Sequence, residues 1–241
     1  MKISAILWDY DGTLVNSVKK NIEVTKEVLK NFIPDLDNNL PKALTSVENY
    51  EEANYKYKNW RELYKFAYGL TDEQIDEAGK LWSPYQLKDA TLPDMFDKMD
   101  YVVNNLSNIK HGICSQNCSK NIYNTLKHYN VEKCFHSIIG YEDISYTEQK
   151  PNPKAFLKCV EKLDISLDNS TLVYIGDHQE DTIFGKNAEE SYKSQGYNTK
   201  VICIAANYSG NTPNDWFVKP DFTAYSTTDI LDIINKVLHK K

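Results

Sequence analysis

Two carboxylates two residues apart end the first apolar segment, in the stretch ILWDYDGTLVNS at residues 6–17. In an extended strand, alternate residues point to the same face, so Asp9 and Asp11 can face one cleft about 6 to 7 Å apart. Carboxylates this close repel unless a cation lies between them or one holds a proton. Both arrangements suit phosphoryl transfer, in which Mg²⁺ neutralises one acid and the other donates a proton. The alternative is a plain strand-ending turn, because Asp-Gly is a common turn pair.

Later apolar segments end in residues that could hold a phosphate group. Ser115 ends HGICS, and its hydroxyl, together with the following backbone N–H groups from Gln116 on, could hold phosphate oxygens. Lys150 precedes a proline, and a lysine on a stiffened loop is a suitable point charge for phosphate. Each residue also has an ordinary structural explanation, as a turn residue or as a solvated surface lysine.

A third apolar segment, TLVYIG, leads into GDHQED, where Asp177 and Asp181 stand four residues apart around the start of a predicted helix. Acids in this position suit a hard metal ion. They are also common without one, since negative charge at a helix N-terminus stabilises the helix by a few tenths of a kcal/mol.

All these residues must be brought together by strands that end at one edge. Short apolar runs rich in β-branched residues predict buried parallel strands at 3–8, 111–115, 171–176 and 201–206, with a further short strand at 134–140. Helical patterns at 95–109, 152–163, 180–193 and 227–240 alternate with these strands. The helix at 152–163, which precedes the strand at 171–176, is predicted to have Asn152 as its cap and Pro153 in its first turn. The carboxyl ends of strands in such sheets bind ligands. The prediction is an α/β fold with a Rossmann-like doubly wound parallel sheet.

Residues 15–90 have a different character, being polar, rich in aromatic residues and helical in pattern. Helices are expected at 18–32, 54–69 and 70–82, the last with Thr71 as N-cap and Gln74 three residues later. We therefore predict an inserted α-helical cap domain at 15–90 on a core formed by 1–14 and 91–241. Arg61 is the cap residue best suited to a substrate carboxylate or second phosphate, although an exposed helix arginine paired to an acid is the simpler expectation.

Composition restricts the function classes. The 241 residues carry a formal net charge of -6, which gives no basic surplus to attract nucleic acid or an anionic membrane. No apolar run reaches the length of a membrane span, and a cytoplasmic location is expected. The five cysteines form no CxxC pair, so reduced and mostly buried thiols are expected.

Taken as an ordered set, DYDGTLVNS, ICSQN, KPNP and GDHQED resemble the four motifs of the haloacid dehalogenase superfamily. The insertion after the first strand resembles the helical type 1 cap of phosphoglycolate phosphatase-like hydrolases. The resemblance implies a Rossmann-like core, dependence on Mg²⁺ and a phosphoaspartyl intermediate. It also implies roles for the matching residues. Asp9 is the nucleophile and Asp11 the general acid/base, while Ser115, Gln116 and Lys150 bind the phosphate group. The metal ligands are Asp9, Asp11 (through its backbone carbonyl) and Asp177, and Asp181 supports them.

The function expected from the resemblance is Mg²⁺-dependent hydrolysis of a small phosphorylated metabolite. Asp11 favours this reaction, since superfamily members that cleave carbon–halogen or carbon–phosphorus bonds generally lack an aspartate there. A phosphomutase of the same superfamily is the main alternative, followed by a phosphorylation switch or a protein that only binds. No nucleic-acid or membrane partner is expected, and the sequence predicts no oligomeric state.

Overall fold

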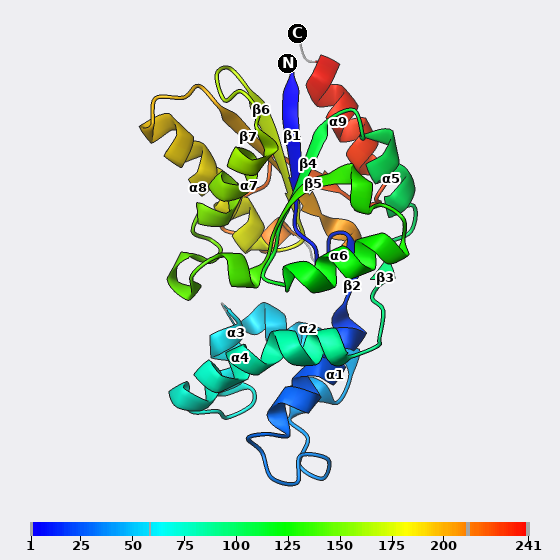
Figure 1. Cartoon of the computed structure of the whole chain (residues 1–241), viewed down its shortest axis with the longest axis vertical. Helices are drawn as coiled ribbons and strands as arrows, with labels where there is room; N and C mark the ends of the chain where they lie inside the picture. Colours follow the sequence, from blue (N-terminus) through cyan, green and yellow to red (C-terminus); the bar gives the residue numbers. More distant parts are fainter. Residues whose placement is uncertain (1, 58, 211–212, 240–241) are drawn as a thin grey trace. The chain divides into compact units, whose positions relative to one another are not determined.

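The computed structural model describes residues 2–57, 59–210 and 213–239 (Figure 1). The chain divides into two compact units, of which the first comprises 1–16 and 94–241 and the second comprises 17–93. The first unit alternates strands and helices, and the second is helical. The predicted α/β class is confirmed.

A six-stranded sheet forms the centre of the first unit, and every neighbouring pair of its strands is parallel. From β1 the chain first adds strands on one side of β1 and then returns to add strands on the other side, so β1 and its neighbours form the switch point where such sheets bind ligands. In sheet order the strands are β5 (Phe135–Ile139), β4 (Lys110–Cys114), β1 (Ile3–Trp8), β6 (Thr171–Gly176), β7 (Lys200–Ala206) and β8 (Phe222–Ala224).

The predicted strands at 3–8 and 171–176 coincide with β1 and β6. The prediction for β7 differs by one residue at its start, and those for β4 and β5 differ by one residue at both ends. Sequence reasoning missed the three-residue strand β8 and an antiparallel ribbon formed by β2 (Val15–Asn16) and β3 (Asp94–Met95). These strands are too short to show a hydrophobic period.

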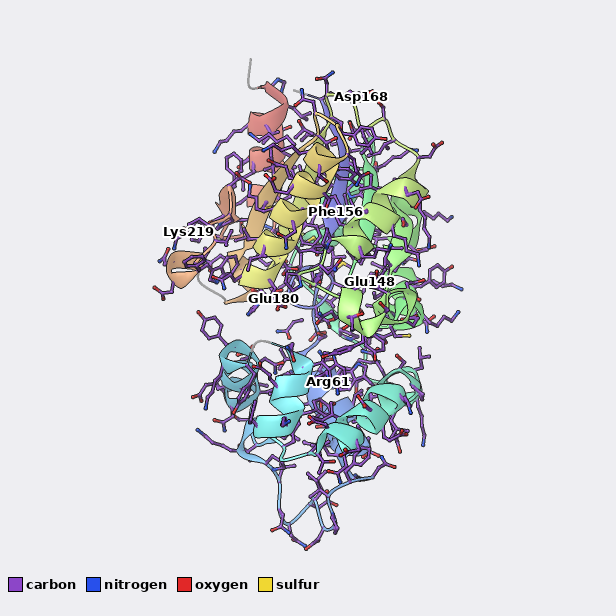
Figure 2. The ribbon with its side chains drawn as sticks, turned by 90° about the vertical axis from the view of Figure 1, so that its left-hand side faces the viewer. Arg61, Glu148, Phe156, Asp168, Glu180 and Lys219 are labelled. Atoms are coloured by element: carbon purple, nitrogen blue, oxygen red, sulfur yellow. The ribbon has the colours of Figure 1, made fainter. Side chains whose placement is uncertain are left out.

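Helices cover both faces of the sheet. Successive residues of β1 point to opposite sides, and because those on both sides are apolar, each face has to be covered. Ile6 and Trp8 belong to the apolar cluster under α5 (Met99–Asn105), α6 (Ser119–His128) and α9 (Asp229–His239). Ala5 and Leu7 belong to the cluster under α7 (Lys154–Leu163) and α8 (Gln179–Ser194). Figure 1 shows α7 and α8 on one side of the sheet and α5 and α9 on the other. In Figure 2, Phe156 lies within the second cluster, where its ring contacts those of Tyr174 and Phe184.

The start of α7 differs from the prediction. The helix begins at Lys154, so Pro153 occupies the N-cap position that the sequence assigned to Asn152. The Asn152 side chain still accepts a hydrogen bond from the backbone N–H of Lys154, at 3.0 Å. The predicted residue therefore makes the capping interaction, from the position before the N-cap, because proline has no side-chain acceptor of its own.

The second unit consists of α1 (Val18–Leu29), α2 (Val47–Lys56), α3 (Trp60–Phe66) and α4 (Asp72–Lys88). The predicted capping box at the start of α4 is present: Thr71 and Gln74 exchange hydrogen bonds between side chain and backbone. The single helix predicted at 54–69 is wrong, because α3 starts afresh with Asn59 as its N-cap. Among the described residues of both units, single-turn helices lie at Lys42–Leu44, Glu132–Cys134, Tyr141–Asp143, Tyr146–Glu148, Asn207–Ser209 and Pro213–Asp215.

Within the described part of the chain, no helix combines the length and the apolar character needed to cross a membrane. All five cysteines are free thiols, and four of them are buried.

Candidate active site

Asp9 follows directly after β1 and is 7% exposed. Its backbone N–H donates to the carbonyl of Ile175 at 2.8 Å, which fixes the end of β1 against β6. The chain then turns at Gly12, whose φ of +73° is a left-handed conformation that glycine adopts without strain. A Cβ added at Gly12 would lie 2.2 Å from Oδ2 of Asp177. The glycine in the DYDG motif therefore leaves room for the carboxylate of Asp177, which follows the neighbouring strand β6.

Lys150 brings a positive charge to this edge. Its Nζ lies 2.5 Å from Oδ1 of Asp9 and 2.7 Å from Oδ1 of Asp181, and its side chain is only 7% exposed. Burial alone would lower the pKa of Lys150, but the carboxylates of Asp181 and Asp9 outweigh burial and raise it. Lys150 is thus a permanently charged ammonium group in contact with two acids.

Asp181 is held from several directions at the start of α8. Its Oδ2 accepts the backbone N–H of His178 at 3.1 Å, and its Oδ1 accepts the hydroxyl of Tyr174 at 3.3 Å. Gly176 ends β6 beside this carboxylate, and a Cβ there would lie 2.3 Å from the carboxyl carbon of Asp181. Asp181 is therefore fixed in place, as expected of a residue that supports a metal site.

Three acids at this edge could hold a metal ion. Asp9, Asp177 and Asp181 each offer a carboxylate oxygen, and these oxygens all lie within 4.8 Å of one another. Burial and the surrounding acids raise the pKa of Asp9 in spite of Lys150, and burial with the charge of Asp181 raises the pKa of Asp177 to about 7. The raised pKa values mean that the ionised carboxylates of Asp9 and Asp177 are disfavoured, because they are buried close to other acids and this edge carries an excess of negative charge. A hard divalent cation such as Mg²⁺ would relieve it, so the donor set fits the expected metal.

The predicted phosphate-binding residues share one pocket of the first unit. Ser115, Gln116 and Lys150 line it together with the side chains of Tyr141 and Ile144. Ser115 is buried at the end of β4, and Lys150 reaches the pocket from the loop before α7. The structure therefore brings the three residues to one pocket, and one of them, Lys150, contacts Asp9.

Asp11 has a partner that the sequence did not suggest. Asn117 donates from Nδ2 to both carboxylate oxygens of Asp11, at 3.1 and 2.9 Å. Asn117 lies two residues after Ser115, in the turn between β4 and α6. It stands in the quoted ICSQN motif, but nothing local in the sequence links it to a residue 106 positions away.

Comparison with known proteins shows the family of the chain. A model of the haloacid dehalogenase-like hydrolases matches residues 6–192. The chain belongs to this family. Curated relatives include the pyrophosphatase PpaX of Listeria welshimeri, 27% identical over 97% of each chain, and that of Bacillus mycoides, 22% identical over 98% of this chain and 99% of the relative. These matches make the chain a hydrolase of the phosphatase type.

Solved structures of the family share the fold. A protein from Haemophilus somnus 129PT, predicted to be a phosphoglycolate phosphatase, has a TM-score of 0.70 at 18% identity, covering 97% of this chain and 99% of its own. A CbbY variant from Rhodobacter sphaeroides, solved in complex with xylulose-1,5-bisphosphate, has a TM-score of 0.68 at 14% identity, covering 95% and 96%. The fold of this hydrolase is therefore that of the family over nearly the whole chain.

Other polar residues of the hydrolase have structural partners. Arg61, in the second unit (Figure 2), pairs with Asp76 at 2.6 Å, as the simpler expectation had it. His178 is the N-cap of α8, and its Nδ1 accepts the backbone N–H of Glu180 at 3.3 Å. Burial and the charge of Asp181 raise the pKa of Glu180, in the first turn of α8, to about 7.

Proposed function

We propose that this hydrolase is a Mg²⁺-dependent phosphatase that cleaves a small phosphorylated metabolite through a phosphoaspartyl intermediate on Asp9. The observation that carries the proposal is the position of the Asp9 carboxylate: it is buried at the switch point of the sheet, bonded to Lys150 and close to the oxygens of Asp177 and Asp181. A carboxylate in a shielded, positively compensated site suits attack on an anionic phosphate.

In the proposed first step, one Asp9 oxygen bonds to phosphorus while the bond from phosphorus to the leaving oxygen breaks. Asp11 gives its proton to that oxygen, which leaves as an alcohol. In the second step, Asp11 takes a proton from water, whose oxygen attacks the phosphoaspartate and releases inorganic phosphate and free Asp9. Ser115, Gln116 and Lys150 would hold the phosphate oxygens throughout, since all three line one pocket.

Asp9, Asp177 and the backbone carbonyl of Asp11 would hold Mg²⁺, supported by Asp181. When bound, the ion would lower the repulsion between the anionic nucleophile and the anionic substrate. Lys150 contributes to the same end from the protein itself, because it lies between two of the acids.

The substrate is proposed to be a phosphate ester, and pyrophosphate is the second candidate because the curated relatives are named as pyrophosphatases at nearly full coverage. We propose that residues 15–90 act as a cap that recognises the rest of the substrate. In the case of pyrophosphate, the leaving group would be a second phosphate and Asp11 would protonate it in the same way.

The test measures phosphate release from a panel of phosphorylated metabolites and pyrophosphate, with Mg²⁺ or with EDTA. Release should require Mg²⁺ and fall by roughly a thousandfold or more in Asp9→Asn, as when other covalent nucleophiles are removed. Asp168→Asn is a matched control, because Asp168 is exposed in the loop before β6 (Figure 2). Unchanged release in Asp9→Asn would refute the proposed nucleophile.

The lifetime of the phosphoenzyme separates this proposal from its alternatives. With a substrate whose leaving group needs no proton, intact mass should show a phosphorylated form that decays quickly in the wild type and accumulates in Asp11→Asn, because the variant can still form the phosphoaspartate but lacks the base for the second step. A phosphorylated form that persists in the wild type would indicate a switch. Transfer of the group to a second sugar hydroxyl in place of water would indicate a phosphomutase.

A further inference from the structure

Asn117 connects two parts of the candidate active site. Its side chain is buried, with the whole residue 3% exposed, and Nδ2 donates to both oxygens of Asp11 at 3.1 and 2.9 Å. Its backbone N–H donates to Oγ of Ser115 at 3.1 Å. One residue therefore contacts both the proposed general acid/base and a proposed phosphate-binding residue.

The orientation of the Asn117 amide is fixed by a second asparagine. Asn121, in the first turn of α6 and 4% exposed, donates from Nδ2 to Oδ1 of Asn117 at 3.0 Å. With Oδ1 engaged there, the amide presents its two N–H donors to Asp11; the flipped amide would place its oxygen against a carboxylate and its N–H₂ against another donor. The backbone carbonyl of Asn117 is also engaged, accepting the N–H of Tyr141 at 2.9 Å.

We propose that Asn117 is a positioning residue that holds the carboxylate of Asp11 at a fixed position relative to the proposed phosphate-binding hydroxyl of Ser115. This inference rests on the proposed phosphatase function. Asp11 is partly exposed on a turn after β1, and Asn117 contacts both of its carboxylate oxygens. Asn117 supplies that contact from the loop that also carries Ser115, and α6 anchors the loop through Asn121.

The inference predicts a specific kinetic defect. Misplacing a reacting group by about 1 Å can cost on the order of a hundredfold in rate. Asn117→Ala should therefore lower kcat by about tenfold to a hundredfold, with KM changing by less than about threefold. A loss that acted only through disorder of the phosphate-binding loop would instead raise KM.

An isosteric variant separates donation from shape. Asn117→Asp keeps the shape of the side chain but replaces the N–H donors with acceptor oxygens that repel Asp11. If Asn117 positions Asp11 by donation, kcat of Asn117→Asp should be as low as that of Asn117→Ala or lower. If Asn117→Asp keeps more than half of the wild-type kcat, shape alone matters and the inference is wrong. Asn105→Ala is the control, because Asn105 is exposed on α5 and its amide donates to the backbone carbonyl of Tyr101 in its own helix.

A double-mutant cycle completes the test. In an Asp11→Ala background, Asn117→Ala should lower the remaining phosphate release by less than twofold, since the residue it positions is absent. Losses that multiply would overturn the inference. Wild-type protein that releases no phosphate from any compound would instead refute the proposed function, and the positioning role would fall with it. Wild-type activity that survives in Asn117→Ala would overturn the positioning role alone.

Discussion

Two regions of the first unit bury ionisable side chains, and they treat them differently. At the edge where the strands end, Asp9, Asp177 and Asp181 crowd together, and Lys150 compensates only part of their charge. Within the sheet, His111 on β4 is fully buried, and both of its ring nitrogens are satisfied by neutral partners. The strand-end region keeps an excess of negative charge that Lys150 does not balance, whereas the surroundings of His111 carry no such excess.

The bonds of His111 fix its protonation state. Nδ1 accepts the indole N–H of Trp8 at 2.9 Å, so the ring proton lies on Nε2, which lies 2.9 Å from the carbonyl oxygen of Leu106 and donates to it. A second proton would face the Trp8 donor, and burial also lowers the pKa of His111 to about 4. The neutral ring is therefore a structural element of the sheet, and its plane lies within 15° of that of the Trp8 ring to which it is hydrogen-bonded.

The two regions make stability depend on pH in opposite ways. Between pH 6.5 and 4 the unfolded chain protonates His111 and the folded chain does not, so the free energy of unfolding falls as the pH falls. Between pH 3.8 and 7 folded Asp177 keeps a proton that the unfolded chain has lost, so the same free energy falls as the pH rises. A buried ionisable group points to function when its surroundings leave charge unbalanced, as they do for Asp177 and not for His111.

The largest effect should come from removing the cation of the first region. Lys150→Met leaves Asp9 and Asp181 buried without compensation, so the free energy of unfolding in EDTA should fall by about 3 to 5 kcal/mol. Lys65→Met, which breaks the exposed pair with Asp72, should have a far smaller effect, because water screens that pair. Urea unfolding at pH 7.5 would measure both, and equal effects would contradict the charge imbalance.

The next effect concerns the second region. His111→Gln should remove the histidine's contribution to the pH dependence, which amounts to about 3 kcal/mol between pH 6.5 and 4. Urea unfolding across this range would be compared with His128→Gln, in which the lost histidine is exposed on α6. If wild type and His111→Gln lose stability in parallel as the pH falls, His111 is not held neutral.

A smaller effect of opposite sign should come from Asp177→Asn. Removing this charge in EDTA at pH 8 should raise the free energy of unfolding by about 2 kcal/mol after allowance for partial exposure, and the gain should shrink toward pH 4. Mg²⁺ should raise the Tm of the wild type and not that of the variant. A variant less stable than the wild type at pH 8 would show that repulsion is absent.

The smallest effect should come from the Arg61 pair in the second unit. The Arg61 side chain is 21% exposed and that of Asp76 is 61% exposed, so Asp76→Asn should change the free energy of unfolding by less than about 1 kcal/mol. Thermal unfolding would measure it. A loss of several kcal/mol would place this pair with the buried charges of the first region.

Local patterns predicted most of the fold, because β1 and β6 are continuous apolar runs with clear ends. The positions of the motifs at the ends of predicted strands also predicted that the acids and Lys150 lie at one edge of the sheet. Local patterns could not predict contacts between distant segments: Asn117 reaches Asp11 across 106 positions, and Trp8 reaches His111 across 103. Nor could they predict β8, whose three residues are too few for a period.

The two glycines beside the acids limit how this hydrolase can evolve. Any side chain at Gly12 would collide with Asp177, and any side chain at Gly176 would collide with Asp181. A library randomised at both positions and selected for activity should return glycine at each. New substrate preferences in this scaffold would therefore have to arise elsewhere, while the neighbourhood of the reacting atoms stays the same from variant to variant.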